Sequence, residues 1–557
     1  MLTGVSDQAG ATRAARAGRG LGPRRRRPTR RARRGRPSAL VVVAVAAGLV
    51  LLFYCAQREA HQLGTQSDGA GMVLEGWAML HGNLLLHGWH LSDVSFYTTE
   101  LPEYMLVELV RGLNPDVVRI CAALTYTLLV ALAAAVAYGR RPADKRAAAI
   151  RAAIAVAVMI GPTVAAATVL LNDPDHTGTA VPVLVALLVL DRGGRRWWVP
   201  AVVAAMLGWA LVGDSLVLLI GAAPLVIVGG ARSFGKLALR GQPLSAAWHD
   251  LSLAAAGLAA AAGGSTLAAL IKAGGGFTLS PPTTKYAVPS AALPVNLSAL
   301  ASNFLGLFSA DFFGARLNGW LLVIAVHLAF ACLVAGALYL ALRSLRRDVL
   351  HGDPITQLLA VAIVLNLLAY LLLYRGTSAT VREIAPVFGL GAALAGRVLA
   401  EPLLRRRLEP LLALGAVAAV VALLPPLLTV TPAPPAAAGL ARFLAGHDLT
   451  NGLAGYWNAN AVTLDSGDRV IIRSVRFQPG YGLAAYPWEI DTRLYDGGAG
   501  DANFLVATAP GDRSTVTKPE AIAAFGRPYR RYHYQGYTIM VWQKNLLRQL
   551  RSAYRAD

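Results

Sequence analysis

Charged residues are scarce in this chain. Asp, Glu, Lys and Arg make up 15% of its 557 residues, whereas apolar types make up 55% and the mean hydropathy is +0.49. An ordinary soluble domain carries about 25% charged residues, so this chain has too few to cover a water-facing surface of its length. The low charge argues against a soluble globular protein and indicates that lipid is the solvent for most of the chain.

Cysteine is equally rare. The three cysteines, Cys55, Cys121 and Cys332, all fall in or beside apolar runs, and the polar C-terminal region has none. This distribution implies no disulfide framework, and we expect the three thiols to pack as small apolar side chains.

Several motifs of soluble enzymes and pumps are also missing. The sequence has no Walker loop, no dinucleotide-binding glycine fingerprint, no zinc-ligand spacing and no serine nucleophile elbow. These absences argue against a primary transporter and against a soluble-type dehydrogenase. No repeat relates one half of the chain to the other, which weakens the case for a secondary transporter.

Long apolar runs are what the chain does contain, and most match the roughly 20 residues needed to cross about 30 Å of hydrocarbon. They predict a mainly α-helical, polytopic transmembrane bundle with about eleven spans over residues 38–430. The shortest runs are candidates for broken or re-entrant helices. The expected spans lie near 38–54, 117–138, 150–171, 178–190, 198–212, 215–229, 250–271, 319–342, 355–374, 384–399 and 410–430.

The net charge of +21 is concentrated before the first apolar run, in an Arg-rich tail at residues 1–37. Such a tail is typical of a disordered cytoplasmic segment attracted to anionic lipid. A nucleic-acid-binding arm and a twin-arginine export signal are the alternatives. Because many spans follow and no small-residue cleavage site comes after Tyr54, a retained signal anchor fits better, and we expect no nucleic-acid partner.

Positive charge in the short loops predicts the orientation. Every second loop is rich in Lys or Arg, whereas Asn172–Thr179 and Gly213–Ser215 contain neither. Because positive loops stay in the cytoplasm, the long polar segments 57–115 and 272–318 and the C-terminus are expected outside a plasma membrane.

The composition changes after Pro425. The stretch TPAPPAAAG is typical of a linker, and RVIIRSVRF, NFLVAT and YTIMVW are typical of strands. We therefore predict a small extracytoplasmic α/β domain over residues 431–557.

The segment SDGAGMVLEGWAMLHG holds the first candidate site residue, Asp68, at the start of an expected amphipathic helix. Asp68 is either a helix cap or a catalytic carboxylate, and the two roles are compatible. Further along the same segment, Trp89, Tyr97 and Glu100 are candidates for an acceptor or sugar surface. The alternative is that the aromatic residues anchor the loop at the lipid interface.

The loop NDPDHTG holds a second candidate group, Asp173, Asp175 and His176. Carboxylates beside an imidazole bind a divalent cation or orient a hydroxyl group. The alternative is a solvated turn. A divalent cation is thus one candidate cofactor, with these three residues as its ligands.

Cations form the third candidate group. Arg375 and Arg382 lie in LYRGTSATVREIAP, where Thr380 is a candidate helix cap, and Lys285 lies in the other long external segment. Arginine binds phosphate through two parallel hydrogen bonds, and a helix N-terminus favours an anion. These residues are candidates for a phosphate site, and interfacial arginines that reach to lipid headgroups are the alternative.

The order of these features resembles the GT-C superfamily of membrane glycosyltransferases, which includes protein O-mannosyltransferases and aminoarabinose transferases. The resemblance rests on the overall arrangement and on SDGAGMVLEGWAMLHG, NDPDHTG and VREIAP. It implies sugar transfer from a polyprenyl-phosphate donor at the outer face of the plasma membrane. Asp68 then matches the first-loop acid, Asp173 or Asp175 with His176 matches the second-loop acidic group, and Arg382 matches a cation on the lipid phosphate.

One position departs from the family pattern, because Gly69 follows Asp68 where the family often has a second acid. A non-catalytic scaffold with the same fold is therefore an alternative. A transporter or flippase for a lipid-linked substrate is another, and Asp214, between two short apolar runs, is the residue that favours it.

Overall fold

The computed structural model describes residues 39–140, 144–172, 176–281, 288–313, 320–373, 376–429, 432, 434–496, 500–511 and 515–550. The chain divides into two compact units, Met1–Gly48 and Leu49–Asp557. The second unit contains nearly all of the described residues and every contact discussed below.

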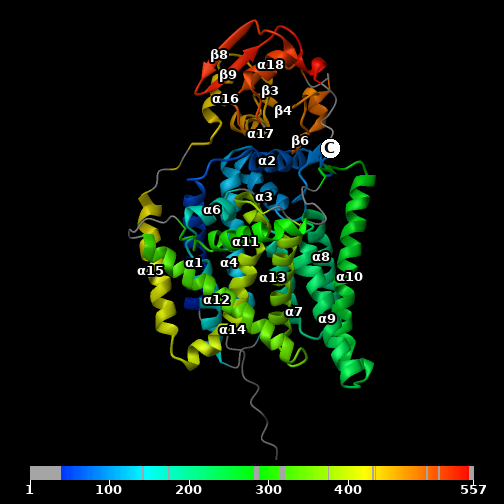
Figure 1. The fold of residues 1–557 in the computed structure, drawn as a ribbon, viewed down its shortest axis with the longest axis vertical. Coiled ribbons are helices and arrows are strands. Elements are labelled where there is room, and N and C mark those ends of the chain that lie inside the picture. Colours follow the sequence, from blue (N-terminus) through cyan, green and yellow to red (C-terminus); the bar gives the residue numbers. More distant parts are fainter. Residues whose placement is uncertain are drawn as a thin grey trace, which may run out of the picture. The chain divides into compact units, whose positions relative to one another are not determined.

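Apolar helices form most of the second unit (Figure 1). The helices of the bundle are α1 (Ala39–Ala60), α4 (Asp116–Tyr138), α5 (Lys145–Met159), α6 (Val164–Leu170), α7 (Ala180–Gly193), α8 (Val199–Gly213), α9 (Ala223–Phe234), α10 (Leu244–Ala273), α11 (Leu293–Leu307), α12 (Trp320–Arg347), α13 (Pro354–Leu373), α14 (Pro386–Arg405) and α15 (Glu409–Thr429).

Within the described part of the chain, eight helical segments are long and apolar enough to cross a membrane, and two further apolar helices are shorter. The protein is thus a multi-pass membrane protein with a helical bundle, as the sequence predicts. The figure of about eleven spans stays a prediction.

Two elements differ in detail from the predicted spans. The run at 150–171 is broken into α5 and α6, because Pro162 has no backbone N–H to continue a helix and Gly161 takes a positive φ of 66°. Helix α11 lies in the segment 272–318, which was expected to be a polar loop. Its buried Asn296 and Asn303 donate hydrogen bonds to Leu371 O and to the Tyr370 hydroxyl, which explains how a helix with polar positions packs there.

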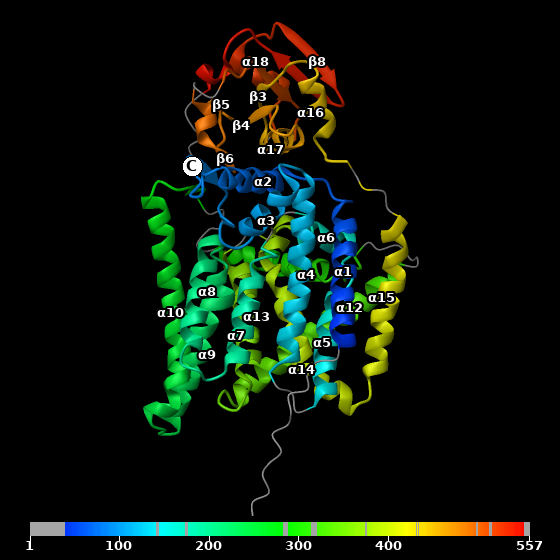
Figure 2. The same cartoon turned by 180° about the vertical axis from the view of Figure 1, so that it is seen from behind.

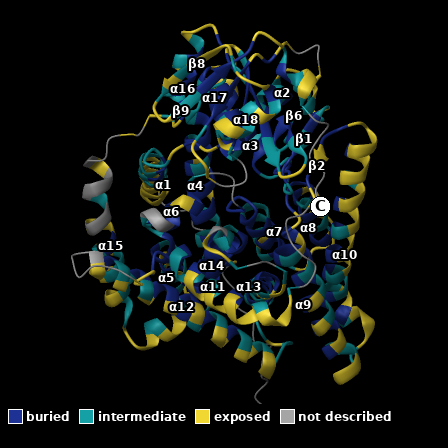
Figure 3. Ribbon diagram, turned by 45° about the horizontal axis from the view of Figure 1, so that its top comes forward, coloured by how far each residue is buried: buried dark blue, intermediate teal, exposed yellow. Residues whose placement is uncertain are grey.

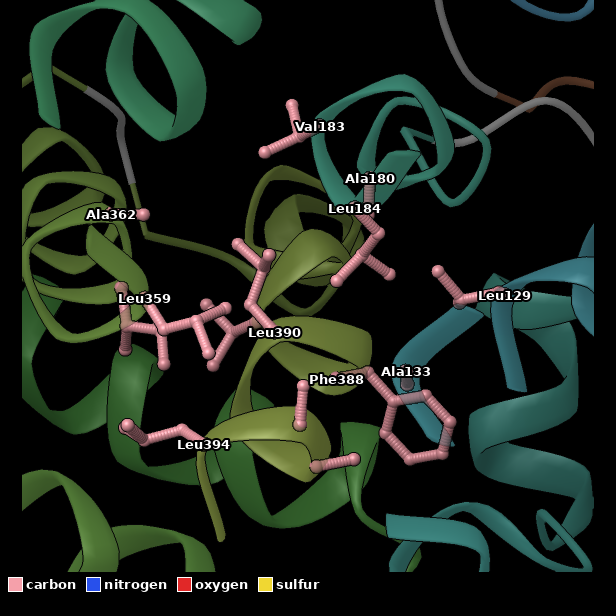
Figure 4. Close-up of a cluster of buried hydrophobic side chains, with 14 of the residues drawn as sticks. Leu129, Ala133, Ala180, Val183, Leu184, Leu359, Ala362, Phe388, Leu390 and Leu394 are labelled. Atoms are coloured by element: carbon pink, nitrogen blue, oxygen red, sulfur yellow. The ribbon is translucent and has the colours of Figure 1, made fainter. Parts of the chain in front are cut away.

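Helix α14 lies at the centre of the bundle and packs against α4, α5, α12 and α13. Its sequence GLGAALAG provides small residues that let neighbouring backbones approach. A Cβ at Gly396 would lie 2.3 Å from the Arg151 carbonyl oxygen. Figure 4 shows Phe388, Leu390 and Leu394 of this helix among apolar side chains from α4, α7 and α13.

Many residues of the outer helices are exposed (Figure 3), and some of them are large and apolar. Leu258 and Leu270 on α10 are each 62% exposed, and Leu322 on α12 is 64% exposed. Side chains of this kind are expected where lipid rather than water is the solvent.

Two helices of the first long segment, α2 (Ser67–Leu80) and α3 (Leu101–Arg111), lie across one end of the bundle (Figures 1 and 2). Strand β1 (Trp89–Leu91) lies between them in sequence. It pairs in parallel with β2 (Thr278–Leu279) and antiparallel with β6 (Ile490–Asp491). This small sheet joins both long loops to the C-terminal domain.

The C-terminal domain is an α/β structure with a six-stranded mixed sheet in the order β5-β4-β3-β7-β9-β8. The three predicted strand segments correspond to β4, β7 and β9. Helix α17 packs on α2, which holds the domain on the bundle end that carries the first long loop. The domain's elements are α16 (Ala438–Ala445), β3 (Asn451–Ala454), α17 (Tyr456–Asp465), β4 (Ile471–Gln478), β5 (Gly482–Ala485), β7 (Phe504–Ala507), α18 (Lys518–Phe525), β8 (Arg530–Tyr534) and β9 (Tyr537–Val541).

Candidate functional site

Asp68 lies in the first turn of α2, and its carboxylate accepts a hydrogen bond from the Tyr456 hydroxyl of α17. The helix starts after Gln66 without a side-chain cap hydrogen bond. Surrounding protein raises the pKa of Asp68 above its usual range, Tyr456 and the charge of Arg382 oppose that rise, and Asp93 adds to it. Asp68 is therefore a partly buried carboxylate within electrostatic reach of a cation.

A second carboxylate shares the same hydroxyl. The Tyr456 hydroxyl oxygen lies 2.7 Å from Glu489 Oε2, and the Asn460 side-chain amide donates to Glu489 O at 2.8 Å. Gly71 of α2 makes room for this approach, since a Cβ there would lie 2.9 Å from Glu489 Oε2. Because Tyr456, Asn460 and Glu489 all belong to the C-terminal domain, that domain supplies part of the site.

Arg382 lies in a 3₁₀ turn, Ser378–Ile384, between α13 and α14, and its side chain is 41% exposed. The Thr377 and Thr380 side chains form a reciprocal capping box at the start of this turn, with Thr377 as the cap residue and Thr380 as the third residue of the turn. Thr380 was predicted to cap the helix that follows, but α14 starts after Ala385 without a side-chain cap hydrogen bond. The charge of Arg382 opposes the rise in the pKa of Asp68, so the two side chains lie within range of an electrostatic interaction.

His176 is held between two carboxylates. Its Nδ1 lies 2.6 Å from Asp214 Oδ2, and its Nε2 lies 3.4 Å from Glu383 Oε2. Asp214 also accepts hydrogen bonds from the Thr179 hydroxyl and, at 2.8 Å, from Leu216 N. His176 has a positive φ of 53°, a strained backbone conformation for a residue with a side chain.

This environment fixes the charges of the pair. Burial lowers the pKa of His176, but Asp214 and Glu383 outweigh burial and raise that pKa well above its usual value. Burial raises the pKa of Asp214, but His176, Thr179 and Leu216 N outweigh it and lower that pKa. The pair is therefore an imidazolium beside a carboxylate at neutral pH.

Glu100 completes the cluster around His176. Its side chain is 4% exposed, and a Cβ at Gly178 would lie 2.3 Å from Glu100 Oε1. Burial raises the pKa of Glu100 to about 8; Thr99 and His176 oppose the rise and Asp214 adds to it. Glu100 is therefore mostly protonated at pH 7, where it can donate a hydrogen bond.

The other two residues predicted to bind an acceptor make packing contacts. The Tyr97 hydroxyl donates to Leu84 O at 2.7 Å, and its ring centroid lies 5.0 Å from that of Phe277. Trp89 is 7% exposed in strand β1. Their predicted role in acceptor or sugar binding stays a prediction.

Adjacent residues link the two parts of the site. Arg382 Nε lies 3.6 Å from Glu383 Oε1, while Glu383 Oε2 faces His176. Arg382 therefore connects the Asp68 side of the site, through Glu383, to the cluster of His176, Asp214 and Glu100.

Four predicted site residues lie outside the described part of the chain: Asp173, Asp175, Lys285 and Arg375. Among the residues that the structure describes, no group of three or more His, Cys, Asp or Glu side chains is arranged to hold a metal ion. The prediction that Asp173, Asp175 and His176 hold a divalent cation therefore stays untested.

Sequence reasoning missed Glu383, Tyr456 and Glu489 as site residues and took Asp214 only as a sign of transport. Glu383 follows directly after Arg382, so the motif VREIAP contained the signal. Tyr456 and Glu489 carried none, because their partner Asp68 lies more than 380 residues earlier in the chain.

The overall fold has a counterpart among solved structures. The chain is similar to ArnT from Cupriavidus metallidurans, whose crystal structure was determined bound to undecaprenyl phosphate, with a TM-score of 0.50 and 14% sequence identity. The match covers 93% of this chain and 100% of the ArnT chain.

The chain has a GT-C-like fold. No protein-family model matches its sequence, and neither does any curated protein. At this identity the likeness to ArnT establishes the GT-C-like fold alone, and function has to be argued from the site.

The charged pair in this GT-C-like bundle leads to a stability prediction. Asp214→Asn should destabilise the protein by about 3–5 kcal/mol, because it leaves a buried imidazolium with one partner fewer. The folded-state pKa of His176 is raised, so its stabilisation is complete below about pH 6.5 and is lost as the pH rises through that raised value. The folded-state pKa of Asp214 is lowered, so its stabilisation is present above about pH 4 and is lost as the pH falls through that lowered value.

Thermal unfolding of purified wild-type and Asp214→Asn protein across pH measures this effect. The difference in Tm should be largest between about pH 4 and 6.5 and should shrink at alkaline pH. Asp311→Asn is the control, because Asp311 is exposed and its carboxylate accepts a local bond from Phe313 N. Equal Tm values for the two variants at every pH would contradict the prediction.

Proposed function

We propose that this protein is a membrane glycosyltransferase that moves a sugar from a polyprenyl-phosphate donor to an acceptor on the extracytoplasmic face. The proposal rests on two side chains within electrostatic range of each other, Asp68 as the base candidate and Arg382 as the phosphate-binding candidate. They come from distant parts of the chain and lie near the ends of membrane helices. The undecaprenyl phosphate bound by ArnT supports a lipid phosphate as the donor's leaving group.

The proposed reaction is a direct displacement. Asp68 takes the proton from the acceptor hydroxyl, whose oxygen forms a bond to the anomeric carbon of the donor sugar. The bond from that carbon to the phosphate oxygen breaks, and its electron pair stays on the polyprenyl phosphate. The configuration at the anomeric carbon is inverted as a result.

Arg382 is the group that would offset the charge gained by the leaving phosphate. Its 41% exposed side chain can reach a headgroup, and guanidinium geometry suits a phosphate. Glu383 orients Arg382 through its Oε1 atom, while its Oε2 atom pairs with His176. In this scheme the cluster of His176, Asp214 and Glu100 is a rigid support for the phosphate side of the site.

The same geometry favours an enzyme over a transporter. Asp214 was the residue that argued for transport, but it lies at the C-terminal end of α8 in a tight pair with His176. A conductive path would instead require ionisable groups in mid-span that face a water-filled cavity.

The test is a transfer assay with purified protein in nanodiscs and a panel of radiolabelled polyprenyl-phosphate sugars. Undecaprenyl phosphate binding is measured in parallel by native mass spectrometry. We expect binding together with turnover of at least one donor, assayed with EDTA and with added Mg²⁺ or Mn²⁺ to establish the metal requirement. Binding without turnover of any donor would favour the scaffold. The absence of both binding and turnover would refute the proposal.

A further inference from the structure

We propose that Glu489 and Tyr456 of the C-terminal domain form, with Asp68, a hydrogen-bonded unit that holds one proton between two carboxyl groups. The proposal rests on the proposed function, in which Asp68 is the base. Tyr456 and Glu489 are positioning residues in this scheme, since they act on the acceptor through Asp68.

Hydrogen-bond geometry is the first step of the argument. One phenolic oxygen lies within hydrogen-bond distance of both carboxylates, Asp68 Oδ1 and Glu489 Oε2. A tyrosine hydroxyl has a single proton to donate, and its oxygen can accept further bonds. If both carboxylates were ionised, one of these two contacts would bring two unprotonated oxygens together. Both contacts are hydrogen bonds when one carboxyl group is protonated and donates to the tyrosine oxygen.

Burial makes the protonated form favourable. Glu489 is 6% exposed and Tyr456 is 4% exposed, so water cannot screen two neighbouring negative charges. Two carboxylates that share a site of this kind do not both ionise readily. The unit therefore retains a proton at neutral pH.

Burial decides which carboxyl group keeps the proton. Glu489 is buried, whereas Asp68 is only partly buried. Burial and the charge of Asp93 raise the pKa of Asp68, and Tyr456 and the charge of Arg382 oppose that rise. We therefore assign the proton in the resting state to Glu489, which donates to Tyr456, and the Tyr456 hydroxyl donates to Asp68. Asp68 is then an ionised base whose orientation is fixed by one strong hydrogen bond.

The surrounding contacts show that the unit is closely packed between the domain and the membrane bundle. The Ser67 hydroxyl donates to Tyr456 O at 2.7 Å, beside the base itself. Asn460 holds the Glu489 backbone carbonyl at 2.8 Å, and Gly71 leaves the space that the Glu489 side chain fills. Gly69 follows Asp68 in the sequence, and Glu489 provides a second carboxylate from the C-terminal domain.

The reaction step balances with this unit. When the acceptor oxygen bonds to the anomeric carbon, its proton moves to Asp68, and the leaving phosphate takes the electron pair of the broken bond. The unit then holds two carboxyl protons and returns one to water. No oxidant or further reactant is needed.

The pH dependence of kcat/KM tests the proposal. Tyr456→Phe removes the donor to Asp68, so the acid limb should move to higher pH by about one unit or more. Glu489→Gln keeps an N–H donor toward Tyr456 but cannot ionise, so it should remove the second, higher ionisation of the carboxyl pair from the profile. Two substitutions in one unit are thus expected to change different limbs of the same curve.

Two matched variants serve as controls. Tyr537→Phe removes another part-buried hydroxyl of the same domain, which lies 3.2 Å from Asn458 Oδ1. Glu520→Gln alters a glutamate that caps α18. Both should leave the pH profile where it is in the wild type.

Infrared difference spectra at neutral pH give a readout that needs no turnover. The difference between the wild-type and Glu489→Gln spectra should contain a protonated-carboxyl band, whereas the difference between the wild-type and Glu520→Gln spectra should not. If neither the band nor the pH profile changes in the two variants while Asp68→Asn is inactive, the shared-proton unit is refuted and the glycosyltransferase proposal stands. If Asp68→Asn transfers sugar at the full rate, Asp68 is not the base and both proposals fail.

Discussion

Asp68→Asn is expected to lower the rate of sugar transfer by about 10²–10⁴-fold while the protein stays folded. Asparagine has nearly the same shape, and its amide oxygen can still accept the hydrogen bond from Tyr456, but it cannot take a proton from the acceptor. The measurement is kcat with a saturating donor, together with the Tm of the same preparation.

Asp116→Asn is the matched control, since Asp116 also lies in the first turn of a helix, α4, where it pairs with Arg119 at 3.0 Å. An acid in the first turn of a helix stabilises the helix dipole by about 0.3–1 kcal/mol. If Asp68 served the helix alone, both variants would lose stability and keep their activity. Full activity of Asp68→Asn would therefore indicate that Asp68 only stabilises the start of α2 and is not the catalytic base.

Hydropathy and charge were sufficient to predict most of the bundle, because lipid imposes one simple rule on every span. An apolar run of sufficient length must cross or lie in the membrane, so α4, α10, α12 and α13 were found within a few residues of their ends. Helix α11 was not predicted, because its segment contains polar residues such as Asn303, whose side chain has hydrogen-bond partners elsewhere in the fold. Those partners cannot be read from the composition of the segment.

The candidate site likewise contains residues that the sequence predicts and residues that only the tertiary structure reveals. Asp68 and Arg382 were selected because ionisable groups at the ends of spans are costly and thus usually have a purpose. The charge of Arg382 acts on the pKa of Asp68, and the structure adds Glu383 and Asp214 as partners of His176. Tyr456 and Glu489 could not be predicted, because their contact with Asp68 depends on how α17 docks on α2.

The docking of the C-terminal domain therefore bears on the chemistry as well as on the fold. Strand β6 fixes the segment around Glu489 to β1 of the first long loop, one residue after Glu489 itself. The sheet β2-β1-β6 and the contact between α2 and α17 keep Glu489 and Asp68 within hydrogen-bond distance of the Tyr456 hydroxyl. Removing the domain would deprive Asp68 of its hydrogen-bond donor.

Arg382→Gln is expected to lower kcat/KM for the lipid-linked donor by about 10²–10³-fold, because the developing phosphate charge loses its cation. Arg382→Lys should recover part of this loss, since lysine restores the charge but not the planar pair of donors. Undecaprenyl phosphate affinity, measured on the same variants, should fall in the same order.

Arg405→Gln is the control for this substitution. Arg405 ends helix α14, which starts just after Arg382, and its exposed pair with Glu401 should contribute no more than about 1 kcal/mol. Its loss should change neither kinetics nor affinity.

The pH profile distinguishes a phosphate contact near the base from an arginine that only anchors the turn to lipid headgroups. Because the Arg382 charge lowers the pKa of Asp68, Arg382→Gln should also move the acid limb of the pH profile to higher pH, whereas loss of a headgroup anchor would leave that limb in place.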